Sequence, residues 1–309
     1  MGALLALAPF PLAAQPAPPP QRTAPAAAFN PVPTPLPGVV HARPALWEVK
    51  DKDTTIYLFG TIHLLRPGIT WLEGPRKAAF DAAQELVLEI AEDADPATQL
   101  RILQRALDPT GPTLTSKLPE AARARFTALL REHGGQAAMV DRMKPWLAAI
   151  TLTALPLGKL GYDPTLGVEA QLRQAARAQG KTITGLETTE EQMGLFESLS
   201  EPLQIKLLVD TINEQDDIEQ SLARMIDAWS AGNPDVLAEQ LNKSMEDDPA
   251  LVQHLLTERN ERWADWIKAR LKQPGTVFLA VGAGHLAGKG SVQEALRKRR
   301  IKSRLLPGD

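Results

Sequence analysis

Two histidines in this sequence follow apolar segments that end in glycine. Gly60 precedes His63 by three residues in YLFGTIH, and Gly282 precedes His285 by three residues in FLAVGAGH. Imidazole can act as a general base or as a metal ligand, and glycine lets the backbone approach a ligand closely. We therefore expect the two histidines to share one site, in turns shaped by Gly60, Gly282 and Gly284.

Glu89 is the carboxylate that the pattern places best beside these histidines. It lies at the end of ELVLEI, opposite in face to the leucines and the isoleucine. Strand, helix and strand patterns in succession predict a parallel pairing with the strand before His63, which brings Glu89 near that histidine. Two imidazoles and one carboxylate suit a hydrolytic divalent metal such as Mn²⁺, Co²⁺ or Zn²⁺, bound by His63, Glu89 and His285. The alternative is a rim carboxylate paired with a lysine.

Three further charged residues are candidates for the same site. Arg259 falls within the apolar stripe of a helix predicted over 249–271. Because unpaired burial of a guanidinium is too costly, Arg259 must either polarise a substrate or form an ion pair with an internal glutamate. Glu169 lies in the first turn of a predicted helix, and Glu187 follows a predicted strand. Either glutamate could be the general base or the partner of Arg259.

The sequence around the remaining histidines and around two acids near Glu89 does not indicate a catalytic or metal site. We assign the following to solvent: His41, His133, His254, Glu92 and Asp93.

The elements that position these candidates predict an α/β protein. Strand patterns occur near both ends of the chain, whereas residues 96–271 are mainly helical in pattern. We expect a central mixed, partly parallel sheet built from both chain ends, residues 42–95 and 272–309, capped by the helical section. Residues 42–309 would then form a single catalytic domain.

Composition limits the classes of function. The chain has 309 residues, a net charge of −3 and no cysteine. The charge gives no reason to expect nucleic acid as a partner, and the lack of cysteine excludes disulfides and thiolate sites. Residues 282–287 satisfy a loose dinucleotide fingerprint, but too little chain follows for the complete βαβ unit.

Residues 1–41 are interpreted as a leader and a tether. MGALLALAPFPLAAQ resembles the apolar region and cleavage site of a secretory signal, although no Lys or Arg precedes it. The Pro- and Ala-rich stretch that follows favours a disordered tether. We expect a periplasmic or secreted protein with no transmembrane segment; the alternative is a cytoplasmic protein.

The chain from about Leu46 onward resembles the TraB/PrgY/GumN family, whose animal relatives are the Tiki proteases. The stretches that carry the resemblance are, in order, LWEV, YLFGTIH, ELVLEI, DPTLGVEAQL, GLETTEEQ, ERNERW and VGAGHLAGKGSV. The resemblance implies a fold similar to that of erythromycin esterase. It also implies an active site made of the two Gly-x-x-His motifs and the strand-end glutamate. Further matching positions are Glu169, Arg259 and Asn260.

The function that the resemblance implies is a metal-dependent hydrolase, most readily a protease, acting on a peptide or small-molecule substrate. Many relatives have an acid two residues after the strand-end glutamate, where this chain has Ala91. Two alternatives stay open. One is an esterase-like hydrolase in which a histidine and Glu89 activate water without a metal. The other is a protein that binds and sequesters a peptide without cleaving it. The absence of the second acid at Ala91 is the feature that supports this alternative.

Overall fold

The computed structural model of the protein describes residues 38–91, 94–132, 140–242 and 248–308. Most of the predicted leader and tether lies outside these residues, as do His133, Glu92 and Asp93. The end of the predicted tether, Val40–His41, forms strand β1 and pairs in parallel with β4 (Ile69–Thr70). Within the described ranges, no helix combines the length and the apolar character needed to cross a membrane.

A six-stranded mixed sheet, in the order β6-β5-β7-β3-β2-β8, forms the centre of the fold. Neighbouring strands from β6 to β3 are parallel, whereas β2 is antiparallel to both β3 and β8. Both ends of the chain supply strands, as predicted, and the α/β class with a mixed sheet is confirmed. The strands are β2 (Leu46–Lys50), β3 (Thr54–Thr61), β5 (Glu85–Ile90), β6 (Thr182–Glu187), β7 (Gly275–Gly282) and β8 (Arg304–Leu305).

One neighbour relation differs from the prediction. The sequence pattern pairs the strand of Glu89 directly with the strand before His63, but β7 lies between β5 and β3. Strand β7 is apolar and buried along most of its length, which suits a central position with both faces covered. As a result, Glu89 ends beside the second Gly-x-x-His motif rather than beside the first.

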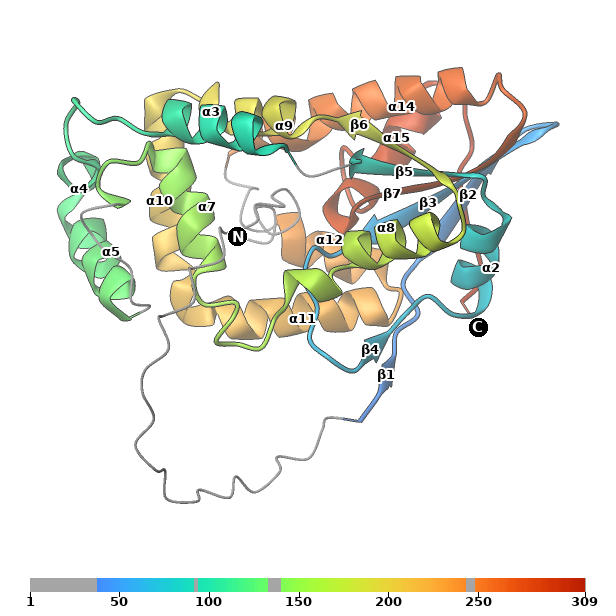
Figure 1. Ribbon diagram of the computed structural model, residues 1–309, viewed down its shortest axis with the longest axis horizontal. Coiled ribbons are helices and arrows are strands. Elements are labelled where there is room, and N and C mark those ends of the chain that lie inside the picture. The colour runs from blue at the N-terminus through green and yellow to red at the C-terminus, as the bar shows by residue number, and fades with distance from the viewer. Residues whose placement is uncertain (1–37, 92–93, 133–139, 243–247, 309) are drawn as a thin grey trace.

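Apolar side chains cover both faces of the sheet. Phe59 and Phe278 belong to the cluster on one face, and Val87 and Leu279 belong to the cluster on the other. Because strand side chains alternate, Glu89 shares the face of Val87. Figure 1 shows α14 above the sheet and α8 below it. Helices α2 (Gly74–Ala82), α8 (Val168–Ala178) and α11 (Ile218–Ser230) pack on the first face, and α14 (Glu258–Arg270) and α15 (Val292–Lys298) on the second.

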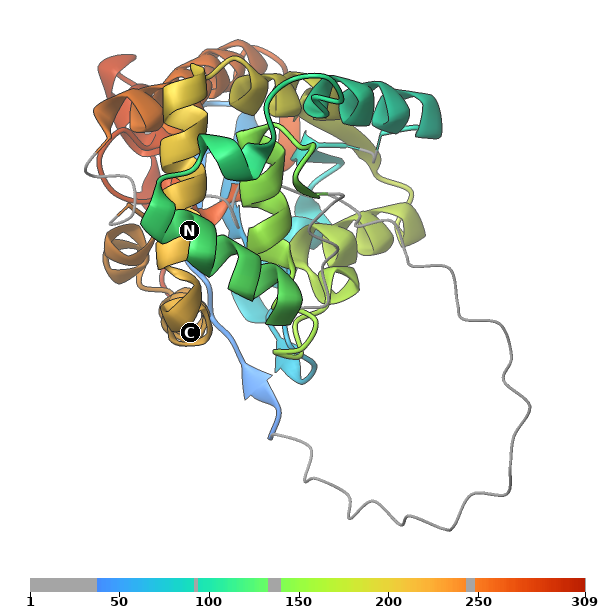
Figure 2. The ribbon, with the colours of Figure 1, turned by 90° about the vertical axis from the view of Figure 1, so that its left-hand side faces the viewer.

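The helical section has an apolar cluster of its own. It lies beyond the carboxyl ends of the parallel strands, at the left of Figure 1, and Figure 2 looks onto it from that side. A capping box formed by Thr188 and Glu191 begins α9. Helices of this cluster include α3 (Pro96–Ala106), α4 (Leu114–Lys117), α5 (Glu120–Glu132), α7 (Pro145–Ala154), α9 (Thr189–Glu197) and α10 (Glu201–Asn213).

Candidate active site

The two Gly-x-x-His loops lie side by side, as predicted. Strands β3 and β7 are adjacent and parallel over their full length. A Cβ atom on Gly60 would lie 3.1 Å from the Cα and Cβ atoms of Ala283, so the close approach of the loops favours glycine there. His63 follows β3 in a loop, and His285 lies in the short 3-10 helix η4 (Ala283–Leu286) that follows β7.

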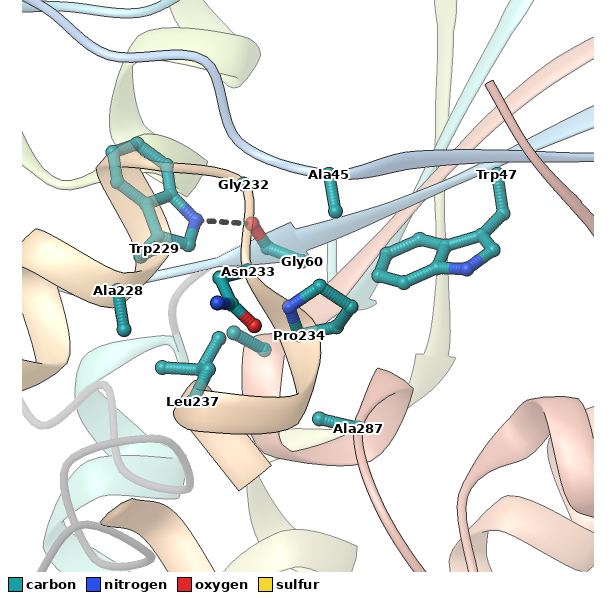
Figure 3. Close-up of a pocket in the computed structure, with 11 residues that line it drawn as sticks. Ala45, Trp47, Gly60, Ala228, Trp229, Gly232, Asn233, Pro234, Leu237 and Ala287 are labelled. Carbon is teal, nitrogen blue, oxygen red and sulfur yellow. Dashed lines mark hydrogen bonds between the residues drawn. The ribbon is translucent and has the colours of Figure 1, made fainter. Parts of the chain in front are cut away.

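Trp229 of α11 forms a hydrogen bond with the backbone of the first Gly-x-x-His motif. Its indole Nε1–H donates a hydrogen bond to the carbonyl oxygen of Gly60 at 2.8 Å, as Figure 3 shows. These two residues line a cavity of about 10 Å³ beside the start of α12 (Pro234–Asn242). A cavity of that size holds about one water molecule, so it is too small for a substrate.

His63 forms a dyad with Glu169. Nδ1 of the imidazole lies 2.6 Å from Oε1 of the carboxylate, and the two side chains are 9% and 15% exposed. The loop of His63 is fastened to the start of α8, where the backbone N–H of Val168 donates to the carbonyl of Ile62 at 3.0 Å. A Cβ atom on Gly167 would collide with the carbonyl oxygen of His63, so this approach requires glycine.

The electrostatics of the dyad favour an ionised glutamate. Burial raises the pKa of Glu169, but the nearby side chains of His63 and Thr61 outweigh burial and lower the pKa overall. Nδ1 of His63 therefore faces an ionised carboxylate, and in the neutral ring that carries its proton on Nδ1 the acceptor nitrogen is Nε2. This arrangement makes His63 a candidate general base.

Arg259 lies at the centre of a second, buried cluster. Nη2 of its guanidinium donates to Glu89 and to Glu187, each at 2.7 Å, and Nη1 lies 2.9 Å from Nε2 of His285. Nε donates to Glu187 at 3.0 Å, and Nη1 to the carbonyl of Leu255 at 3.3 Å. These contacts use all five N–H groups of the guanidinium. Of the two alternatives for Arg259, the structure contains the internal ion pair.

His285 is a buried, neutral histidine with both ring nitrogens engaged. Nδ1–H donates to Oδ1 of Asn260 at 2.6 Å, and Nε2 accepts from Arg259. Asn260 is itself held by a hydrogen bond from Nδ2 to the carbonyl of Gly290 at 2.8 Å. Burial, the charge of Arg259 and the proximity of His63 lower the pKa of His285 well below its usual value. These contacts fix the tautomer with the proton on Nδ1.

Glu89 connects the sheet to this cluster. Its Oε1 accepts the backbone N–H of Gly282 at 2.6 Å and lies 3.7 Å from Nε2 of His285. Its Oε2 accepts from Nε2 of Gln192 at 2.8 Å as well as from the guanidinium. Sequence reasoning missed Gln192. It is a fully buried polar residue on α9 one turn before the buried Phe196, the same anomaly that identified Arg259.

The predicted metal ligands His63, Glu89 and His285 are not gathered into a metal centre in this arrangement. Across the part of the chain that the structure describes, no three His, Cys, Asp or Glu side chains are grouped so that they could hold a metal ion. The guanidinium of Arg259 lies between Glu89 and His285, and His63 is engaged with Glu169. The residues do not fit a divalent ion as they stand, and metal dependence stays a prediction.

The helix that carries Arg259 is interrupted. Instead of one regular helix, the structure has α13 (Pro249–Val252), a π-helical segment Gln253–Thr257 and then α14. Such segments insert an extra residue and change the direction of the side chains that follow, which is frequent at functional sites. The carbonyl of Leu255, inside the π segment, is one of the acceptors of the guanidinium.

A cavity of about 720 Å³ opens beside Glu187. The ends of β5 and β6 and the first turns of α3 and α9 line it, and Ala91 and Thr98 are among the lining residues. Its volume lies within the range of about 300–1,000 Å³ that is usual for small-molecule sites. Glu187 is thus the residue that links this cavity to the cluster around Arg259.

Comparison with known proteins gives one family and three informative relatives. Residues 45–304 match the TraB/PrgY/gumN family. The chain is 23% identical over 286 residues to an uncharacterized protein of Treponema pallidum (strain Nichols), covering 86% of this chain and 84% of that protein. It is 29% identical over 189 residues to the uncharacterized protein YbaP of Escherichia coli (strain K12), covering 61% and 70%.

A relative from zebrafish has a functional name. The chain is 25% identical over 306 residues to a Danio rerio protein named metalloprotease TIKI2, covering 82% of this chain but only 59% of that protein. No solved structure matches the chain. Because the family match extends over most of the sequence, the chain belongs to the TraB/PrgY/gumN family.

Proposed function

We propose that this protein is a hydrolase that cleaves peptide bonds. Family membership and the name of the zebrafish relative, a metalloprotease, support a hydrolase or protease. The observation that carries the proposal is the His63–Glu169 dyad, with a distance of 2.6 Å between Nδ1 and Oε1. It lies at the carboxyl end of a parallel strand, where open α/β sheets bind their ligands.

In this mechanism His63 is the general base. Glu169 holds Nδ1–H, and Nε2 takes a proton from a water molecule whose oxygen attacks the carbonyl carbon of the substrate. The carbon–nitrogen bond of the resulting tetrahedral species then breaks, and the proton passes from Nε2 to the leaving amine. Glu169 offsets the positive charge that the imidazole carries between these two steps.

Arg259 acts in this proposal as a positioning residue. While its five N–H groups bind Glu89, Glu187, His285 and Leu255, it has none to offer a substrate carbonyl. Its contacts fix the ends of β5 and β6 and the second Gly-x-x-His loop relative to one another. That rigid arrangement supports the neighbouring loop of His63, which packs against Ala283 through Gly60.

A second version of the function uses a divalent metal at His63, Glu89 and His285. The name of the zebrafish relative favours it, because that protein is called a metalloprotease. The position of Arg259 favours the metal-free version, because a metal bound by Glu89 and His285 would have to displace the guanidinium. Both versions predict peptide cleavage and differ in their response to chelation.

The test is cleavage of a complex peptide mixture by the purified protein, with new termini identified by mass spectrometry. We expect new termini, and we expect them still after exhaustive chelation. The exposed His41 offers a matched control, since His41→Ala should cleave like wild type. Activity that disappears on chelation and returns with Mn²⁺, Co²⁺ or Zn²⁺ would support the metal version instead. Peptides that are retained without new termini would contradict hydrolysis and indicate sequestration.

The lining of the cavity of about 720 Å³ beside Glu187 does not include His63 or Glu169, so we propose it as the place for a part of the peptide that flanks the cleaved bond. Ala91→Phe would fill part of it, so we expect KM for a cleaved peptide to rise severalfold while kcat changes little. Leu103→Phe is the control, because Leu103 lies on α3 but is 43% exposed and is not among the residues that line the cavity. An unchanged KM in a folded Ala91→Phe variant would remove this cavity from the substrate path.

A further inference from the structure

Three side chains of the kind that bind metals surround the guanidinium of Arg259. The distances are 2.7 Å to Oε2 of Glu89, 2.7 Å to Oε2 of Glu187 and 2.9 Å to Nε2 of His285. Two carboxylates and one imidazole form a ligand set that divalent transition metals accept. Little of their side chains is exposed, 7%, 6% and 0% respectively, although Glu187 also lines the cavity of about 720 Å³. Glu187, which no metal prediction includes, completes this set.

We infer that the guanidinium of Arg259 is the resident cation of this cluster and that it excludes a divalent metal from Glu89, Glu187 and His285. The two carboxylates and the guanidinium sum to a charge of −1. Without the guanidinium the sum would be −2, which is unfavourable for groups that are shielded from water. The cation cannot leave by deprotonation, because arginine stays charged in proteins.

Several contacts keep Arg259 in this position. The side chain is fully buried, and the ring of Trp263 lies under the guanidinium at 4.7 Å from Cζ to the ring centroid. The carbonyl of Leu255 accepts a further N–H from within the π-helical segment. A divalent ion would have to break these contacts as well as the ion pairs.

The second Gly-x-x-His histidine has no lone pair to give a metal while Arg259 is in place. Asn260 accepts the Nδ1–H of His285, so the ring lone pair is on Nε2, and Nε2 accepts from the guanidinium. The two Gly-x-x-His motifs therefore differ in role. His63 is the base of the proposed reaction, and His285 is a positioning residue for Arg259. The exclusion of metal is independent of peptide hydrolysis, because its test measures no activity.

The first experiment uses the wild-type protein with ¹⁵N-labelled histidines and Mn²⁺ as a paramagnetic probe. The ring signals of His285, assigned with a His285→Gln variant, should show the neutral tautomer protonated on Nδ1. We expect these signals to keep their intensity when an equimolar amount of Mn²⁺ is added. Selective broadening of the His285 signals by equimolar Mn²⁺ would overturn the inference.

The second experiment removes the guanidinium of Arg259, so that Glu89, Glu187 and His285 can bind a metal ion. Arg259→Met should gain one equimolar Co²⁺, seen as visible absorption that wild type lacks, and a further Glu89→Gln substitution should abolish it. Arg262→Met is the matched control. Arg262 also contacts Glu187, at 3.4 Å, but its side chain is 55% exposed, so its loss should give no Co²⁺ site. A folded Arg259→Met protein that binds no more Co²⁺ than wild type would contradict the inference. If that variant does not fold, the Mn²⁺ measurement decides.

Discussion

His63→Ala is expected to lower kcat for peptide hydrolysis by about 10²–10⁴-fold, the usual contribution of a positioned general base. The variant keeps the substrate cavity beside Glu187, so KM should change little. Glu169→Gln should also lower kcat, because it removes the charge that holds Nδ1–H and offsets the imidazolium. The measurement is the initial rate on a peptide that wild type cleaves, with far-UV circular dichroism and thermal unfolding recorded for each variant.

Two further histidine variants separate loss of the general base from loss of structure. His41→Ala removes an exposed imidazole from the surface and should leave kcat unchanged. His285→Ala should lower the melting temperature, because it strips a buried N–H of Arg259 of its acceptor. A folded His63→Ala variant with wild-type kcat would refute the role of the dyad. Loss of kcat in His63→Ala without loss of fold, in the presence of a chelator that leaves wild type active, would establish that role, because the metal version also predicts a loss at His63.

Local pattern predicted the approach of the two Gly-x-x-His loops because each follows an apolar strand that can be buried on both faces. It did not predict that β7 would separate β5 from β3. Strand order depends on pairings between distant parts of the chain, and a strand–helix–strand pattern does not say whether another strand lies between. The consequence for the site is that Glu89 accepts from Gly282 of the second motif rather than joining His63.

The partners of the two remaining glutamates show the same limit. Glu187 lies at the end of a strand and Glu169 in the first turn of a helix, which predicts only that both lie near the same edge of the sheet. These positions do not predict which residue each glutamate contacts. Their actual partners, Arg259 for Glu187 and His63 for Glu169, follow from which side of the sheet each element covers. Arg259 was identified because a polar side chain on the apolar face of a helix needs a buried partner. The same criterion applied to α9 would have found Gln192.

Arg259→Met is expected to lower the free energy of unfolding by about 3–5 kcal/mol, as is usual when one partner of a buried ion pair is removed. The methionine fills similar volume, so the loss would report the charge rather than a cavity. Urea unfolding followed by circular dichroism measures it. Arg262→Met, which removes an exposed guanidinium from the same glutamate, should change the free energy of unfolding by no more than about 0.5 kcal/mol.

The double variant Arg259→Met with Glu89→Gln distinguishes charge from packing. Wild type has a cluster charge of −1 from Glu89, Glu187 and Arg259, and Arg259→Met changes it to −2. Adding Glu89→Gln restores −1, so the double variant should be more stable than Arg259→Met alone despite carrying one more substitution. If the double variant is less stable than the single one, packing around the guanidinium rather than its charge stabilises the cluster. In that case Arg259 would not be the cation that balances these carboxylates.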